Sequence, residues 1–318
     1  MQEHPLFSAE RSISSQNFAV ATKQYYGHAD QVTLLQILGG STGTQIEKTE
    51  MEQGIHFITV ATSQATRTCT TCLDTSTGQM TELIGISDIV DKQAASQYEQ
   101  IAISILQSIY PPKALALCGT FPPGLDPTCM ANIFASRQPE KTLVFVDAAK
   151  DIMPILNTGN VDVLKINASE ALDILSCLDT SFSKENAEIT FVANRIAEVA
   201  DIDVVAITDG PHMSYMVDHK LSACYVIEIP NLLANRSQYL DAPALDKEFG
   251  ELVLNPLGAG DTCSAVMLNL MLEGMMPVEA FAMGLAAASA SCLVPMPNCV
   301  FDKAVMSRIR ADINVRLL

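Results

Sequence analysis

The clearest chemical motif in the sequence is a small-residue turn, Asn255-Pro-Leu-Gly-Ala-Gly-Asp-Thr262, that precedes an apolar stretch from Val266 to Met275. Because glycine has no Cβ, Gly258 and Gly260 allow successive backbone N–H groups to converge on one point. At a helix start, such N–H groups and the helix dipole attract an anion. The turn therefore predicts a phosphate site in which Asp261 takes a proton from an attacking hydroxyl. An isolated turn of this type is equally compatible with a helix that Asp261 simply caps.

The composition indicates one large folded domain over residues 1–318. Of the 318 residues, 48% are hydrophobic and 17% are charged, which is enough apolar material for a sizeable core and too much for disorder. The length allows two domains, but no linker or change of composition divides the chain.

The charge of the chain excludes several classes of partner. A formal net charge of −17 argues against nucleic acid and against anionic membranes, since both require a basic surface. No apolar run reaches the roughly 18 residues of a spanning helix, and the first residues lack the pattern of a secretory signal. These features predict a soluble cytoplasmic protein.

The cysteines and histidines do not suggest a metal or disulfide framework. Nine cysteines, an odd number, are scattered through apparent core segments, which is typical of buried thiols in a reducing compartment. Cys69 and Cys72 form a lone CxxC pair in a predicted strand, where a three-residue offset directs them to opposite faces. The five histidines form no ligand-spaced cluster, so we expect no structural metal site.

The elements that must position the turn alternate between apolar strands and helices. Such alternation predicts a parallel sheet covered by helices on both faces. A polar interruption at residues 76–78 separates two strands, at 67–74 and 79–84, that read as a hairpin. We expect the other strands at residues 32–38, 56–60, 113–117, 142–146, 161–166 and 203–207, and helices at 16–26, 92–108, 126–136, 168–177, 184–200, 262–275 and 277–292, with a further helix ending near 53.

Several polar segments follow predicted strands directly. In open parallel sheets, ligands bind at the carboxyl ends of the strands, so residues 118–124, 165–170 and 208–211 are expected to meet the turn at 255–262. Residues 39–43, Gly-Gly-Ser-Thr-Gly, lack the Lys-Ser/Thr of a Walker A motif and read as a simple strand-to-helix turn.

With these motifs in this order, the chain resembles the PfkB/ribokinase family of carbohydrate kinases, and within it the phosphosugar branch that contains tagatose-6-phosphate kinase and 1-phosphofructokinase. The resemblance covers about residues 12 to 310. It implies an α/β fold, a ribokinase-like three-layer sandwich with a mostly parallel central sheet and a small β lid at residues 66–84. The similar motifs are Gln16-Asn-Phe-Ala19, Leu38-Gly-Gly-Ser-Thr-Gly43, Thr66-Arg-Thr68, Cys118-Gly-Thr-Phe-Pro-Pro-Gly124, Lys165-Ile-Asn-Ala-Ser-Glu170 and the turn at 255–262.

The resemblance implies ATP-dependent phosphoryl transfer to a hydroxyl of a sugar or sugar phosphate, with Mg²⁺ as cofactor. Such a transfer requires positioning and charge neutralisation more than covalent chemistry. The implied roles are a base at Asp261, an anion hole at Gly258, Ala259 and Gly260, ATP contacts at Lys165, Thr208, Gly210 and Ala286, a hydrated Mg²⁺ at Asn167 and Glu170, and acceptor contacts at Asn17, Thr120 and Arg67.

Taken one by one, these residues have simpler interpretations. Lys165 and Glu170 resemble ordinary surface residues, and Asn167 is equally suited to cap a helix. Thr120 fits a purely structural role in the Phe-Pro-Pro turn, and Arg67 can pair across the hairpin with Asp74 or Glu82.

The N-terminus differs from the family pattern. Only residues 1–11 precede Ser12, so we expect the family's first strand, the aspartate after it and the hinge diglycine to be absent, and the lid to be incomplete. This difference leaves a second hypothesis, a catalytically impaired nucleotide-binding or interaction protein on a kinase fold. A dinucleotide-dependent dehydrogenase is disfavoured because no Gly-x-Gly-x-x-Gly follows an early strand. A homodimer is compatible with either hypothesis.

Overall fold

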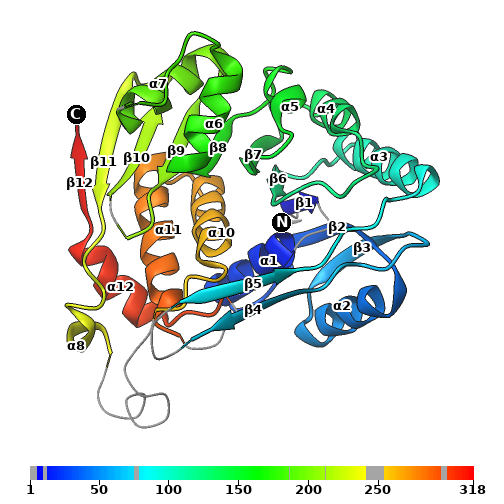
Figure 1. Ribbon diagram of the computed structural model, residues 1–318, viewed down its shortest axis with the longest axis horizontal. Coiled ribbons are helices and arrows are strands. Elements are labelled where there is room, and N and C mark those ends of the chain that lie inside the picture. The colour runs from blue at the N-terminus through cyan, green and yellow to red at the C-terminus, as the bar shows by residue number, and fades with distance from the viewer. Residues whose placement is uncertain are drawn as a thin grey trace.

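The structure is a computed structural model that describes residues 6–9, 13–74, 79–185, 187–211, 213–240, 254–294 and 299–318. In this part of the chain a ten-stranded sheet forms the centre, in the order β12-β11-β10-β9-β8-β7-β6-β1-β2-β3 (Figure 1). Neighbouring strands from β3 through β9 run parallel, and the β9–β10, β10–β11 and β11–β12 pairs are antiparallel. The strands are β1 (Leu6–Ala9), β2 (Val32–Leu38), β3 (His56–Ala61), β6 (Ala114–Cys118), β7 (Leu143–Asp147), β8 (Val163–Asn167), β9 (Val204–Thr208), β10 (Met213–Asp218), β11 (Ala223–Glu228) and β12 (Asn314–Leu317).

The prediction that the family's first strand is absent is wrong. Strand β1 lies between β2 and β6 and runs parallel to both, with Phe7 opposite Thr33 and Leu115. Four residues are too few to show a periodic pattern, but pairing with a strand on each side supplies hydrogen bonds that a sequence pattern does not reveal. The predicted absence of an aspartate after this strand concerns residues 10–12, which lie outside the described residues.

Helices cover both faces of the sheet, which confirms the predicted α/β three-layer architecture. Strand side chains alternate between the layers: in β6, Ala114 and Ala116 pack on one side, and Leu115 and Leu117 pack on the other. The first layer holds α1 (Ile13–Tyr26), α10 (Ala259–Leu272), α11 (Pro277–Cys292) and α12 (Lys303–Asp312); the second holds α3 (Lys92–Leu106), α4 (Pro127–Ala135), α5 (Met153–Leu156), α6 (Ala168–Leu178) and α7 (Ile189–Ala200).

A separate two-stranded sheet projects from the β2 side of the molecule (Figure 1). Its strands, β4 (Cys69–Leu73) and β5 (Met80–Ile84), pair in antiparallel fashion, as expected of a hairpin. The hairpin is tied to the turn before α2 (Gly40–Gln53), because Thr66 N donates to Gly39 O at 2.9 Å and Thr66 Oγ1 accepts from Gly39 N at 3.1 Å. All nine cysteines, including Cys69 and Cys72, are free thiols.

Several elements lie beyond the predictions. Strands β10, β11 and β12 extend the sheet past β9, and α5, α12 and the short helix α8 (Arg236–Tyr239) were not expected. Helix α10 begins at Ala259, three residues before the predicted start. Gly258 is the residue before the helix and adopts a left-handed conformation with φ of 75°, so that the helical backbone can begin at the next residue. None of the helices in the described part combines the length and apolarity needed to cross a membrane.

Candidate active site

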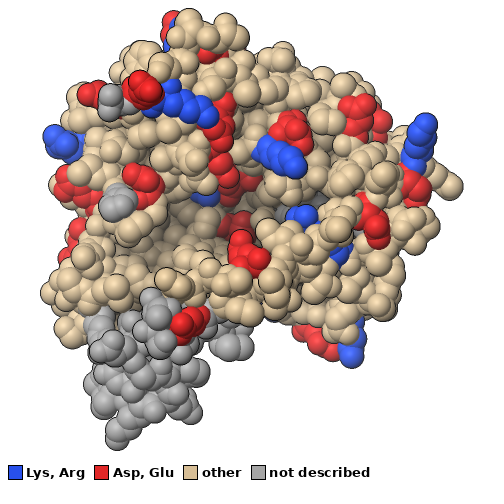
Figure 2. Space-filling view, in the orientation of Figure 1, with Lys and Arg blue, Asp and Glu red and all other residues tan. Residues whose placement is uncertain are grey.

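The carboxyl ends of the central strands and the start of α10 border a cavity of about 560 Å³. Figure 2 shows the hollow at the centre of this face, with acidic side chains running into it. This position is the one expected for a ligand site in an open parallel sheet. The lining residues are Ser14, Gly119, Thr120, Asp147, Ala148, Ala149, Lys150, Lys165, Asn167, Glu170, Asp173, Thr208, Gly260 and Asp261.

The turn before α10 is built by local hydrogen bonds. Asn255 Oδ1 accepts from Leu257 N at 3.2 Å, and the carbonyl of Gly258 accepts from Thr262 N at 2.9 Å and Thr262 Oγ1 at 2.8 Å. The N–H groups of Gly260 and Asp261 belong to the first helical turn, where no carbonyl of the same helix can accept from them. Since both residues line the cavity, the helix start is suited to an anion.

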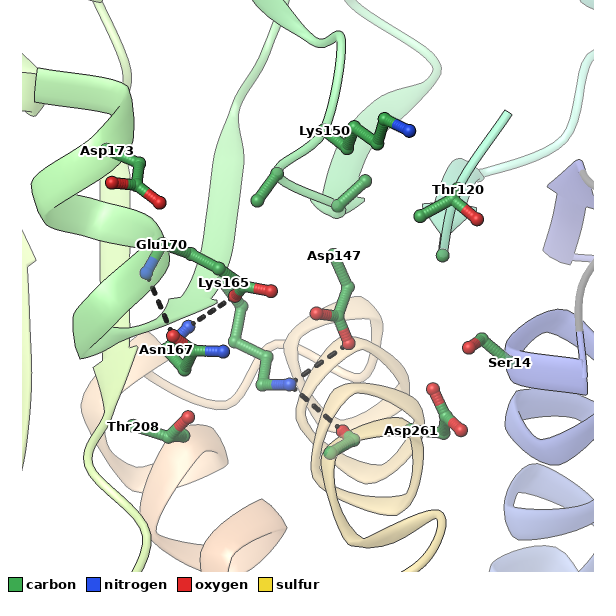
Figure 3. A pocket seen from close by; sticks show the side chains of 14 residues that line it. Ser14, Thr120, Asp147, Lys150, Lys165, Asn167, Glu170, Asp173, Thr208 and Asp261 are labelled. Carbon is green, nitrogen blue, oxygen red and sulfur yellow. Dashed lines mark hydrogen bonds and ion pairs between the residues drawn. The ribbon is translucent and has the colours of Figure 1, made fainter. Parts of the chain in front are cut away.

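Asp261 is held at the border between α10 and α1. Asn17 Nδ2 donates to Asp261 Oδ2 at 2.7 Å, and Ser14 lies beside the same carboxylate (Figure 3). Burial and then the negative charge of Asp147 raise the pKa of Asp261 to about 7, against the lowering effect of Asn17, Lys165 and Ser14. A carboxyl group with a pKa near neutrality is suited to general base catalysis.

Asp147 and Lys165 form a buried ion pair between β7 and β8. Phe145 and Val163 are paired in register and face the α10 layer, so Asp147 and Lys165, two residues further along each strand, face it too. Lys165 Nζ lies 3.0 Å from Asp147 Oδ2. Burial is the largest single effect and lowers the pKa of Lys165, but the charge of Asp147, the hydrogen bond to it and the smaller effects of Cys263 and Asp261 together raise the pKa above its ordinary value. The ammonium therefore stays charged.

Both partners of this ion pair also contact α10. Lys165 Nζ donates to the carbonyl oxygen of Gly260 at 3.1 Å (Figure 3). The hydroxyl of Ser264 lies 2.5 Å from Asp147 Oδ2 and 3.0 Å from the same carbonyl oxygen. The first turn of α10 is thus connected to two strands of the sheet.

Asn167 and Glu170 form a capping box at the start of α6. Asn167 Oδ1 accepts from Glu170 N at 2.9 Å, and Glu170 Oε2 accepts from Asn167 N at 2.8 Å, so the simpler interpretation of Asn167 as a helix cap is confirmed. Burial is the largest cause of a raised pKa at Glu170. Both residues line the cavity, and so does Thr208 at the end of β9.

The described residues contain no cluster of three histidine, cysteine or acidic side chains that could hold a metal ion. Asn167 and Glu170 nevertheless offer oxygen ligands at the cavity, and each of these oxygens has a second lone pair beyond its capping bond. This set fits a Mg²⁺ that keeps most of its water ligands and is held largely by phosphates.

The structure brings together most of the residues predicted from the sequence. Asn17 reaches the site through its bond to Asp261, whereas Gly258 and Ala259 are not among the residues that line the cavity. Arg67 and Gly210 are exposed and lie outside the lining, and Ala286 is fully buried within α11. The predicted residues that line the cavity are Thr120, Lys165, Asn167, Glu170, Thr208, Gly260 and Asp261.

Several lining residues, above all Asp147, were not predicted from the sequence. Asp147 directly follows the predicted strand at 142–146, so the strand-end rule that selected the other segments applies to it equally well. Lys150 lies three residues further along the same loop, and Asp173 lies one turn beyond Glu170. Ser14 carried no signal, because a serine near a helix start has many structural roles.

An open parallel sheet with a cavity at its strand ends, bordered by a helix start and a carboxylate, is an arrangement suited to enzymes that transfer a phosphoryl group to a hydroxyl. The pfkB family carbohydrate kinase profile matches residues 14–299, and the chain belongs to this family. It is therefore a carbohydrate kinase, and the family implies ATP as the phosphoryl donor.

Solved structures of the same fold include phosphofructokinases. Phosphofructokinase-2 from Escherichia coli in complex with potassium superposes with a TM-score of 0.77 at 17% identity, over 97% of this chain and 99% of that one. A possible 1-phosphofructokinase from Thermotoga maritima gives a TM-score of 0.77 at 14% identity, over 99% and 100% of the two chains. Other structures of the E. coli enzyme include a complex with fructose-6-phosphate and a tetrameric inhibited form. No curated protein matches the chain significantly in sequence.

Proposed function

We propose that this chain transfers the γ-phosphoryl group of ATP to a hydroxyl of a sugar phosphate. The observation that carries the proposal is the carboxylate of Asp261, which lines the cavity at the start of α10 and has its pKa raised to about 7. A base with this pKa is largely ionised slightly above neutrality and still accepts a proton effectively.

The chemistry follows from the position of Asp261. An acceptor hydroxyl beside Asp261 would lose its proton to this carboxylate as it attacks the phosphorus. The N–H groups of Gly260 and Asp261, together with the dipole of α10, would stabilise the charge that develops on the transferring group. Gly258 and Ala259 serve this anion hole by setting the path of the turn.

On the nucleotide side, Thr208, Asn167 and Glu170 line the same wall of the cavity (Figure 3). We expect Thr208 and Gly210 to lie along the nucleotide, and Ala286 to pack behind it in the core rather than touch it. Asn167 and Glu170 would hold Mg²⁺ through its water ligands. When bound, this ion neutralises phosphate charge.

On the acceptor side, Thr120 and Ser14 border the cavity near Asp261 (Figure 3). Thr120 and Asn17 are expected to bind acceptor hydroxyls, and Arg67 to bind the acceptor's phosphate from the hairpin. The hairpin is where the family resemblance places the lid, and its closure over the cavity would bring Arg67 closer. The solved complex of the E. coli neighbour with fructose-6-phosphate supports an acceptor that already carries a phosphate.

The test is ATP consumption with a panel of acceptors: fructose 6-phosphate, fructose 1-phosphate, tagatose 6-phosphate, the unphosphorylated sugars and nucleosides. We expect turnover with at least one phosphosugar and weaker turnover with the unphosphorylated sugars. ATP binding without turnover on any acceptor would instead support the impaired nucleotide-binding protein.

The exposed apolar side chains of the hairpin support a homodimer. Leu83 and Ile84 on β5 are 62% and 61% exposed, and Ile86 is 94% exposed. Apolar side chains gathered on one projecting element are typical of an interface. Light scattering should give twice the chain mass for the wild type and a monomer for Leu83→Asp.

A further inference from the structure

We propose that Lys165, Asp147 and Ser264 position the anion hole through their contacts with the first turn of α10, and that Lys165 is a positioning residue rather than a contact of the ATP phosphates. This inference rests on the proposed function and adds residues that act through Gly260 and Asp261.

The ammonium group of Lys165 is buried and bonded to acceptors of the protein itself. Lys165 is 3% exposed, and two of its three N–H donors are accounted for, by Asp147 Oδ2 at 3.0 Å and by the carbonyl of Gly260 at 3.1 Å. Leaving Asp147 for a phosphate would deprive a largely buried carboxylate of its counter-charge, which is costly. Lys165 is therefore held in place with or without a nucleotide.

The contacts of Lys165 and Ser264 hold the peptide unit that joins Gly260 to Asp261. A peptide plane is rigid, so fixing the carbonyl of Gly260 also fixes the N–H of Asp261 in the same peptide unit. Lys165 Nζ on β8 donates a hydrogen bond to this carbonyl. The hydroxyl of Ser264, one turn along α10, lies within hydrogen-bond distance of both this carbonyl and Asp147 Oδ2 on β7. The network thus fixes the direction of the Asp261 N–H at the cavity.

The charges of Asp147 and Lys165 change the pKa of Asp261 in opposite directions. Asp147 raises the pKa of Asp261, and Lys165 lowers it. Removing one charge at a time should therefore move the pH dependence in opposite directions, which a loss of packing alone would not do.

The test compares Lys165→Met and Asp147→Asn in the full chain. For Lys165→Met we expect kcat to fall about tenfold or more because the anion hole is misaligned, while the KM and the calorimetric Kd for ATP stay within about threefold. The acid limb of the pH profile, where kcat/KM falls as Asp261 is protonated, should move to higher pH in Lys165→Met and to lower pH in Asp147→Asn. Ser264→Ala, which changes no charge, should lower kcat with no shift of the limb.

Arg137→Met provides the matched control. Arg137 forms an ion pair with Asp162, and this pair is also shielded from solvent. Neither residue lines the cavity. This variant should lower the melting temperature and leave the acid limb in place. Where a single variant does not fold, the double variant Lys165→Met/Asp147→Asn removes both buried charges together and keeps the kcat and ATP-binding measurements available.

Loss of ATP binding by tenfold or more in Lys165→Met, with the wild type active, would overturn this inference and restore Lys165 as a phosphate contact. Acid limbs that move together in the two charge variants would also overturn it. A wild type that turns over no acceptor would instead contradict the proposed function itself, so the two failures are distinguishable.

Discussion

Asn17 and Asp261 are joined by a hydrogen bond of 2.7 Å between residues 244 positions apart in the sequence. The bond links α1 to the start of α10, so the candidate base is oriented by an element from the other end of the chain. Because the Asn17 amide donates to the ionised carboxylate, it also opposes the effects that raise the pKa of Asp261.

Replacing Asn17 with alanine should move the acid limb of kcat/KM to higher pH. Without the donated hydrogen bond the carboxylate is less stabilised, so a smaller fraction of Asp261 is ionised at neutrality. We expect an activity loss of about tenfold near pH 7 and a smaller loss near pH 9. Gln24→Ala is the control, because Gln24 is on the same helix but donates to Phe301 O. An equal loss at both pH values would show that Asn17 does not tune the base.

Alanine at Gly258 and at Gly260 should have different effects on stability. Gly258 has φ of +75°, and a Cβ there would meet Cys299 Sγ at 2.3 Å, whereas a Cβ at Gly260 meets only Lys165 Nζ, at 3.4 Å. Gly258→Ala should lower the free energy of unfolding by roughly 1 to 3 kcal/mol. Gly260→Ala should fold almost normally and lose activity through crowding at the anion hole. Equal melting temperatures for the two variants would contradict this view of the turn.

Replacing Asp261 with asparagine should make the protein more stable at alkaline pH. The folded-state pKa of about 7 lies above the ordinary aspartate pKa of 3.8, so between these values the folded state binds more protons than the unfolded state. The stability of the wild type therefore falls as the pH rises through this window, and asparagine removes that loss. The melting temperature of Asp261→Asn should exceed that of the wild type by more at pH 8 than at pH 5. A constant difference would show that Asp261 is not desolvated.

The sequence predicted the layered sheet and most of the cavity because both follow from local signals. Continuous apolar strands predicted β6 to β9, and the strand-end rule selected Lys165, Asn167 and Thr208, which line the same cavity. The rule also applies to Asp147, which was overlooked because a single aspartate after a strand has no distinctive neighbours.

Other features depend on tertiary context that sequence patterns do not carry. Strand β1 has four residues and owes its place to partners on both sides. Asn17 acquires its role only when α1 packs against α10, and Ser264 only when α10 packs over β7. The burial of Ala286 and the exposure of Arg67 likewise depend on helix and hairpin placement.

Glu50 provides a second source of pH-dependent stability, away from the cavity. It is fully buried on α2, it accepts from Gln36 Nε2 at 2.7 Å, and burial is the main cause that raises its pKa to about 7 from 4.5. Stability should therefore fall as the pH rises from about 4.5 to 7, and Glu50→Gln should flatten this part of the curve without changing kcat. Glu52→Gln, on the exposed side of the same helix, is the control. A curve for Glu50→Gln that follows the wild type would show that Glu50 is ionised throughout.

The most direct measurement of the central claim is phosphosugar-dependent ATP consumption by the wild type and by Asp261→Asn at about pH 8, with ATP binding measured by calorimetry on both. If Asp261 is the base, the variant loses about a thousandfold in kcat and binds ATP with an unchanged Kd. If turnover persists in Asp261→Asn within a few-fold of the wild type, the acceptor is activated elsewhere and the assignment of Asp261 is wrong.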